Sequence, residues 1–208
     1  MELSEVLNVD DLIYKSTPPE RHKKAMEQKV KLFKDVDLPK DEPPANSSKT
    51  TKEELTTLAQ YNNGEINLSI VKQGDNILES FKKYLKKHNL RFNERYYEQI
   101  KNEAKKFVLT LKYKHNRPRP KQLAKHFGTK GFEHSTMASM KTPSFPSGHS
   151  AIGTLIALAL AKEFPSHKKQ LLKLGKFISN SRLMARAHFP SDVKVGEKLG
   201  KALFKGLK

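Results

Sequence analysis

The 208-residue sequence contains no cysteine, and long apolar runs are also missing. Without cysteine the chain has no disulfide bonds, no thiolate metal site and no cysteine nucleophile. The longest apolar run, from Ala151 to Ala161, is far shorter than the roughly 20 residues of a membrane-spanning helix. The acidic N-terminus, MELSEVLNVDD, is unlike the basic start of a secretory signal. We therefore expect a soluble protein that stays in the reducing cytoplasm.

Acidic residues are scarce in the C-terminal two thirds of the chain. Residues 1–64 hold 10 Lys and Arg against 12 Asp and Glu, whereas residues 65–208 hold 30 against 10. So positive a segment favours anionic partners, among them phosphate esters, nucleic acid and anionic membrane surfaces. A solvated, lysine-rich surface explains most of these residues equally well. Charge alone therefore indicates a class of partner but no function.

The alternation of apolar and polar residues that is typical of β-strands is absent, and helical periodicity takes its place. Apolar residues recur at helical spacing over 75–88 and 93–111. Residues 150–162 are apolar all round, which predicts a central buried helix. Two further helices are expected over 168–187 and 191–208. The sequence thus predicts an all-α fold, a single-domain helical bundle around a central apolar helix.

The N-terminal part differs in character from the rest of the chain. Residues 1–36 are predicted to form an appendage, part helical and part extended, with a short helix near 21–33. The stretch DVDLPKDEPPANSSK that follows is rich in Pro, Ser and acidic residues and is expected to be extended. A capping-box pattern, Thr51 with Glu54, then predicts the start of a helix. We assign residues 37–208 to one helical domain.

The first candidate cluster lies in LKYKHNRPRP, where Lys112 precedes Arg119 by seven positions. Pro118 and Pro120 stiffen the backbone, so the arginine between them cannot retract into a helix. Both cations are then available to an anion. A basic helix end stabilised by the helix dipole is the alternative explanation, and for this cluster alone it is the simpler one.

The second cluster is Pro146-Ser147-Gly148-His149, directly before the central apolar helix. The unpaired N–H groups at the start of a helix favour an anion. Ser147 can cap the helix, and Gly148 lets a ligand approach the backbone closely. A plain serine cap explains Pro146 and Ser147 but leaves His149 without a role.

The third cluster lies in SRLMARAHFPSD. Local structure explains part of it, because Pro190 is expected to end a helix and Ser191 to cap the next one. Arg182 and His188 stand six positions apart, about 120° round a helix, so His188 must lie where the helix ends. Asp192, four residues further on, can accept a hydrogen bond from the His188 imidazole and so determine its tautomer.

Together the clusters supply three cations, a helix N-terminus, two histidines and one aspartate. Such a set can hold a tetrahedral oxyanion, attack it with one imidazole and protonate the leaving oxygen with the other. The three motifs, Lys-x6-Arg-Pro, Pro-Ser-Gly-His and Ser-Arg-x5-His-x3-Asp, resemble the signature of the type 2 phosphatidic acid phosphatase superfamily. Within it the chain is most similar to the soluble class A bacterial non-specific acid phosphatases, over about residues 37–205.

The resemblance implies a metal-independent acid phosphatase that hydrolyses phosphomonoesters through a phosphohistidine. His188 would be the nucleophile, Asp192 would orient it, and His149 would protonate the leaving oxygen. The first motif falls on Arg119, because counting back from Arg117 reaches no lysine. No metal or cofactor is expected, and vanadate is expected to inhibit. The residues that would bind the phosphoryl oxygens are Lys112, Arg119, Ser147, Gly148 and Arg182.

Two other functions stay open. Vanadium-dependent haloperoxidases share these motifs, with vanadate in the phosphate site and His188 as its ligand, although they are generally much longer. The positive segment also suits a protein that binds nucleic acid or an anionic membrane surface weakly, and such binding falls steeply with salt. Class A relatives are typically exported and often disulfide-bonded, so the resemblance does not imply the natural substrate. The sequence neither requires nor excludes a homo-oligomer.

Overall fold

The computed structural model describes residues 8–14, 17–133 and 140–208. Helices dominate these ranges, whose only β-type pairing is a single bridge between Phe33 and Leu207. The predicted all-α fold is therefore confirmed. The helices are α1 (Glu20–Glu27), α2 (Lys49–Gln60), α3 (Leu68–Asp75), α4 (Ile77–Lys87), α5 (Glu94–His115), α6 (Pro120–His126), α7 (Gly148–Glu163), α8 (Lys168–Met184) and α9 (Pro190–Lys205).

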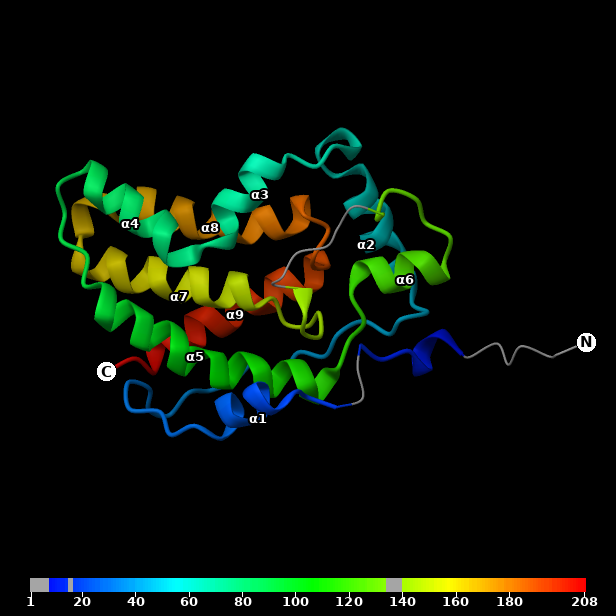
Figure 1. The fold of residues 1–208 in the computed structure, drawn as a ribbon, viewed down its shortest axis with the longest axis horizontal. Coiled ribbons are helices and arrows are strands. Elements are labelled where there is room, and N and C mark those ends of the chain that lie inside the picture. The colour runs from blue at the N-terminus through cyan, green and yellow to red at the C-terminus, as the bar shows by residue number, and fades with distance from the viewer. Residues whose placement is uncertain (1–7, 15–16, 134–139) are drawn as a thin grey trace, which may run out of the picture.

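Helix α7 lies at the centre of the bundle, as predicted for the apolar stretch (Figure 1). It packs most extensively against α8 and α9, and it also contacts α5 and α4. Leu155, Ile156 and Leu160 of this helix are completely buried. A helix without a polar face is stable in water only when its neighbours surround it, so the burial of α7 organises the bundle.

Helix α9 approaches the start of α7 closely because it presents glycine there. A Cβ atom on Gly196 would lie 2.5 Å from the carbonyl oxygen of Ser147, and one on Gly200 would lie 2.4 Å from that of Ala151. Packing at this distance leaves no room for a larger side chain. The N–H of Ser147 also donates to the carbonyl oxygen of Asp192 at 2.9 Å. The third motif is thereby held against the second.

The chain before α2 packs on the bundle, with α1 lying along α5 (Figure 1). Helix α1 ends earlier than the helix predicted over 21–33. The carboxylate of Glu103 on α5 accepts the N–H groups of Lys31 and Leu32 at 2.7 and 2.8 Å. Phe33, two residues after Lys31, is buried in the main core. These contacts need an extended backbone, which explains why the helix ends before them.

The predicted N-cap of α2, Thr51, is wrong by three residues. Ser48 caps α2 instead, because its hydroxyl oxygen accepts the N–H of Thr51 at 3.2 Å. Glu54 consequently closes no capping box. Its carboxylate accepts a hydrogen bond from the guanidinium of Arg117 at 3.3 Å, 63 positions along the chain.

The predicted helix boundary at Pro190 is also wrong. Helix α8 ends at Met184, and Pro190 is the first residue of α9, where a proline has no N–H to leave unpaired. Ser191 does not cap this helix, since it lies inside the first turn. The carboxylate of Asp192 accepts the N–H of Phe189 at 2.9 Å and so acts at the helix start in its place.

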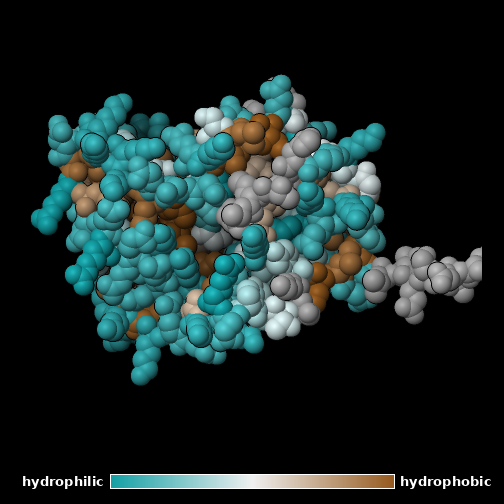
Figure 2. Space-filling view, viewed as in Figure 1, coloured by the Kyte–Doolittle hydropathy of each residue, from teal (hydrophilic) through white to brown (hydrophobic). Residues whose placement is uncertain are grey.

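Hydrophilic side chains cover most of the face shown in Figure 2, with apolar side chains visible between them in the middle of that face. The apolar residues of α7 are mostly buried beneath its neighbours. Within the three described ranges, no helix combines the length and the hydropathy that crossing a bilayer requires.

Candidate active site

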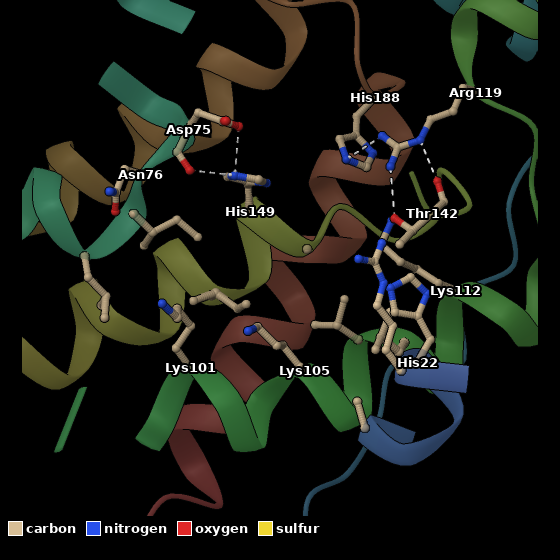
Figure 3. Close-up of a pocket in the computed structure, with 18 of the residues that line it drawn as sticks. His22, Asp75, Asn76, Lys101, Lys105, Lys112, Arg119, Thr142, His149 and His188 are labelled. Atoms are coloured by element: carbon tan, nitrogen blue, oxygen red, sulfur yellow. Dashed lines mark hydrogen bonds and ion pairs between the residues drawn. The ribbon is translucent and has the colours of Figure 1, made fainter. Parts of the chain in front are cut away.

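A cavity of about 780 Å³ lies between α1, α3, α5 and the start of α7. It brings together residues of all three motifs, as Figure 3 shows for Lys112, Arg119, His149 and His188. Gly148 also lines it. The other residues assigned to the site from the sequence lie buried behind this wall, namely Ser147, Arg182 and Asp192.

The histidine of the third motif, His188, is held in one tautomer. Its Nε2 lies 3.0 Å from Nη1 of Arg119. A guanidinium can only donate hydrogen bonds, so Nε2 accepts and carries a lone pair. The proton of the neutral imidazole is then on Nδ1, which lies 3.4 Å from Oδ2 of Asp192. This contact is long for a hydrogen bond, as is common at sites without a bound ligand.

The ionisation of His188 and Asp192 is set by their surroundings. Burial lowers the pKa of His188 well below its ordinary value, and the positive charge of Arg119 lowers it further. Burial alone would raise the pKa of Asp192, but the charge of Arg117 and the contact with His188 outweigh it and hold that pKa below the usual range. A neutral imidazole therefore faces an ionised carboxylate.

Asp192 is fixed by a second arginine that the sequence reasoning did not assign to the site. Nη1 of Arg117 donates to its Oδ1 at 2.7 Å, and both side chains are almost completely buried. The hydroxyl of Ser144 and the N–H of Phe189 donate to its other oxygen. No spacing in the sequence indicates that Arg117 belongs to the site. The chemical reason for the pairing is that a carboxylate buried as deeply as Asp192 needs a cation beside it.

The two cations of the first motif are oriented by backbone carbonyl groups. The ammonium group of Lys112 donates to the carbonyl oxygens of Pro143 and Ser144. Arg119 donates to the carbonyl oxygens of Thr142 and Ala187 at 2.8 and 2.7 Å. Burial, and then the charge of Arg119, lowers the pKa of Lys112 well below its ordinary value. An anion in the cavity would favour the charged form again.

The start of α7 completes this end of the cavity. Ser147 caps the helix as predicted, because its hydroxyl oxygen accepts the N–H of Ser150 at 3.3 Å. A Cβ atom on Gly148 would lie 3.1 Å from Val108 of α5. The glycine therefore lets α7 begin close beside the helix that carries Lys112.

Arg182 and His149 share a partner, Asp75, that the sequence reasoning also missed. Oδ1 of Asp75 lies 2.7 Å from Nη1 of Arg182 and 3.3 Å from Nε2 of His149. The backbone carbonyl of Asp75 lies 3.0 Å from the same Nε2 (Figure 3). A carboxylate thus stands between the two groups expected to meet a phosphoryl group. Arg182 therefore lies behind Asp75 rather than on the cavity wall.

Asp75 also affects the ionisation of His149. Burial lowers the pKa of His149, and the hydrogen bond from its ring to Asp75 partly offsets that effect, while the charge of Arg182 adds to it. His149 and His188 consequently lie on the same cavity with different partners. One is close to a partly exposed carboxylate, whereas the other faces a buried one.

Two helices that the sequence analysis did not predict build this site. Helix α3 carries Asp75 at its last position, and α6 begins directly after Arg119. No group of three His, Asp or Glu side chains in the described part of the chain is arranged to hold a metal ion.

The fold and the site together define an all-α protein with a cationic cavity lined by His22, His149 and His188. The chain belongs to the PAP2 superfamily, whose match covers residues 104–207, and that segment includes all three motifs. Helices α1 to α4 and Asp75 lie outside the matched segment.

Three proteins named as acid phosphatases are similar to parts of the chain. The non-specific acid phosphatase of Salmonella typhimurium is 36% identical over 88 residues, which are 42% of this chain and 34% of the relative. The acid phosphatase of Zymomonas mobilis is 43% identical over 56 residues, 27% of this chain and 21% of the relative. The non-specific acid phosphatase of Providencia stuartii is 42% identical over 53 residues, which are 26% of this chain and 21% of the relative. The matches thus span at most about a third of each relative's length.

Proposed function

We propose that the protein is a phosphatase that hydrolyses phosphomonoesters through a phosphohistidine on His188. The observation that carries this proposal is the state of His188. Its Nε2 accepts from Arg119 and its Nδ1 faces Asp192, so the lone pair points to the cationic end of the cavity. The PAP2 match and the relatives named acid phosphatase support the same reaction.

In this proposal Lys112 and Arg119 bind the phosphoryl oxygens of the substrate, with Ser147 and the backbone N–H of Gly148 at the start of α7. Arg182 contributes once its Nη1 exchanges the carboxylate of Asp75 for a phosphoryl oxygen of the substrate. Backbone carbonyl groups already position Lys112 and Arg119 before the substrate arrives. Preorganised cations stabilise the charge that develops in phosphoryl transfer, because they need little rearrangement during the reaction.

Nη1 of Arg119 turns from Nε2 of His188 to a phosphoryl oxygen, which frees the Nε2 lone pair. Nε2 then attacks phosphorus, and the bond from phosphorus to the ester oxygen breaks. His149 gives its proton to that oxygen, which leaves as an alcohol. Asp192 stabilises the positive charge on the phosphorylated imidazole through Nδ1–H. Water then attacks the phosphorus while His149 takes one of its protons, the P–N bond breaks, and phosphate is released with His188 again neutral. His149 alternates between acid and base, as microscopic reversibility requires.

An assay of phosphate release in EDTA tests the proposed function. We expect p-nitrophenyl phosphate and alkyl phosphates to be hydrolysed without added metal, with vanadate as an inhibitor of the reaction. If added vanadate instead produced halide oxidation, the haloperoxidase alternative would replace this one. A protein that releases no phosphate from any monoester, under conditions in which its helical circular dichroism is intact, is not the phosphatase proposed.

The pH profile of the reaction should depend on Asp75. Because His149 must be protonated to act as the acid, kcat/KM falls as pH rises through the pKa of His149 in the free enzyme. That pKa lies below the ordinary value of a histidine, because burial outweighs the help from Asp75. Asp75→Asn removes a negative charge that raises the pKa of His149, so the falling limb of the pH profile should move to lower pH.

Glu79→Gln is the matched control for Asp75→Asn. It removes one negative charge from the neighbouring α4, and Glu79 does not line the cavity. The substrate's own ionisation contributes equally to every variant. A falling limb that stays in place in Asp75→Asn, or that moves equally in Glu79→Gln, would show that Asp75 does not act on His149. A limb that rises steadily above about pH 8 in the wild type would contradict the acid role of His149 itself.

A further inference from the structure

The cavity extends well beyond the residues that the proposed reaction uses. Lys101 and Lys105 of α5 lie on its wall, below His149 in the view of Figure 3. Arg21 of α1 and Lys72 of α3 line it as well. None of the three motifs includes these four cations, and two of them, Lys101 and Lys105 on one face of α5, form a second basic group.

The positive charge of this second group is largely uncompensated. Nζ of Lys105 donates to the neutral amide of Asn102 at 3.0 Å, and only Lys101 has a carboxylate partner, the part-exposed Glu98 at 2.7 Å. Among the described residues, no carboxylate lies within ion-pair distance of Arg21, Lys72 or Lys105. The described wall of the cavity has one acidic residue, and that carboxylate is already paired with Arg182. One bound phosphate would therefore not neutralise the cavity.

Helix geometry sets the distance between the two basic groups. Lys105 and Lys112 are seven residues apart on α5 and so lie on the same face, about 10 Å apart along the helix axis. Lys101 lies one turn further, about 16 Å from Lys112. Apolar side chains, Val108 of α5 and Ile152 of α7, line the cavity between the two ends. The wall thus alternates from cationic to apolar to cationic.

We propose that Lys101 and Lys105 form a second anion subsite, and that the preferred substrates are bisphosphorylated compounds whose two phosphates are joined by an organic spacer. The inference rests on the proposed function, which places the reacting phosphate at Lys112 and Arg119. A spacer of about 10 Å matches the two ends, whereas the adjoining phosphorus atoms of a diphosphate are too close to reach both. Burial, and then the neighbouring Lys101, lowers the pKa of Lys105. The negative charge of a second phosphate would favour the charged ammonium group and so offset that lowering.

Synthetic phosphates of graded length test the subsite. Hexanediol bisphosphate spans both ends, hexyl phosphate offers the same chain with one charge, and propanediol bisphosphate is too short. We expect kcat/KM for hexanediol bisphosphate to exceed that for hexyl phosphate at least tenfold, where two equivalent phosphates would by themselves give twofold. Propanediol bisphosphate should show a much smaller advantage. Equal values for hexyl phosphate and hexanediol bisphosphate would overturn the proposal.

The variant Lys101→Gln/Lys105→Gln identifies the residues responsible. It should raise KM for hexanediol bisphosphate about tenfold and change KM for hexyl phosphate less than twofold. The matched control, Lys169→Gln/Lys173→Gln, removes two exposed lysines at the same spacing on α8, away from the cavity, and should change neither. An equal rise for both substrates, or an equal effect of the control pair, would mean that the lysines act only through the overall field of the protein, and the subsite would be rejected.

Failure of the subsite and failure of the proposed function give different results. Should the wild type hydrolyse hexyl phosphate but show no preference for the bisphosphate, only the subsite is wrong. Should it hydrolyse neither, the proposed reaction is wrong, and calorimetric titration with hexanediol bisphosphate still tests the subsite. If the two lysine substitutions on α5 weaken this binding about tenfold, the subsite is supported. If they leave the binding unchanged, the subsite is rejected.

Discussion

Replacing His188 with alanine should lower kcat by about 10⁴-fold or more, which corresponds to about 5 kcal/mol of transition-state stabilisation. The loss is large because the proposed reaction has no other nucleophile. Arg119 and Lys112 would still bind the phosphoryl group, so KM should change much less than kcat. Initial rates of phosphate release from an aryl phosphate, measured at several substrate concentrations, separate the two effects.

A second histidine provides the control for this substitution. His126 on α6 is exposed and does not line the cavity, so His126→Ala should keep wild-type turnover. Because the alanine variant of His188 leaves a space on the cavity wall, added imidazole should restore part of its activity. A His188→Ala protein with an intact helical spectrum and more than about a tenth of wild-type kcat would exclude His188 as the nucleophile.

Replacing Arg117 with methionine should destabilise the protein by about 3–5 kcal/mol, because it leaves the buried carboxylate of Asp192 without its cation. The same substitution removes the hydrogen bonds of Arg117 to Ser191, Thr51 and Glu54. The expected fall in Tm is roughly 10 °C. Chemical denaturation followed by circular dichroism gives the free energy of unfolding.

A double-mutant cycle shows whether the charge pair is the cause. Asp192→Asn removes the carboxylate, so Arg117→Met/Asp192→Asn leaves no buried charge of this pair unmatched. The double variant should be more stable than the sum of the two single effects predicts, by about 2 kcal/mol. If the two effects simply add, or if Arg117→Met costs less than about 1 kcal/mol, then Arg117 is not what holds Asp192.

Long apolar periodicity predicted the helices that form the centre of the bundle. Helix α7 is apolar all round and can only be buried, so its position followed from its sequence. The eight-residue α3 gave no such signal, since isolated helices of this length are unstable and depend on packing. Its Gly74 packs directly against Ser181 of α8, a contact between segments about a hundred residues apart.

The motifs predicted which residues gather on the cavity, but not how they are paired. Lys112, Arg119, His149 and His188 share one cavity because α5, α7 and the turn before α9 converge there. Asp75 pairs with Arg182 from 107 positions away, and spacing along the chain contains no trace of such a contact. Arg117 falls outside the first motif, and its pairing with the buried Asp192 joins positions 75 residues apart, which spacing along the chain does not encode.

The central claim is that His188 carries the phosphoryl group during turnover. Enzyme mixed with an aryl phosphate, stopped in base and digested with trypsin, yields the peptide of residues 187–194, in which His188 is the only histidine. Mass spectrometry should find a phosphoryl group on this histidine in the wild type and none in His188→Ala. A phosphoryl group on a different residue, or steady phosphate release with no phosphorylated His188 at any time, would contradict the account.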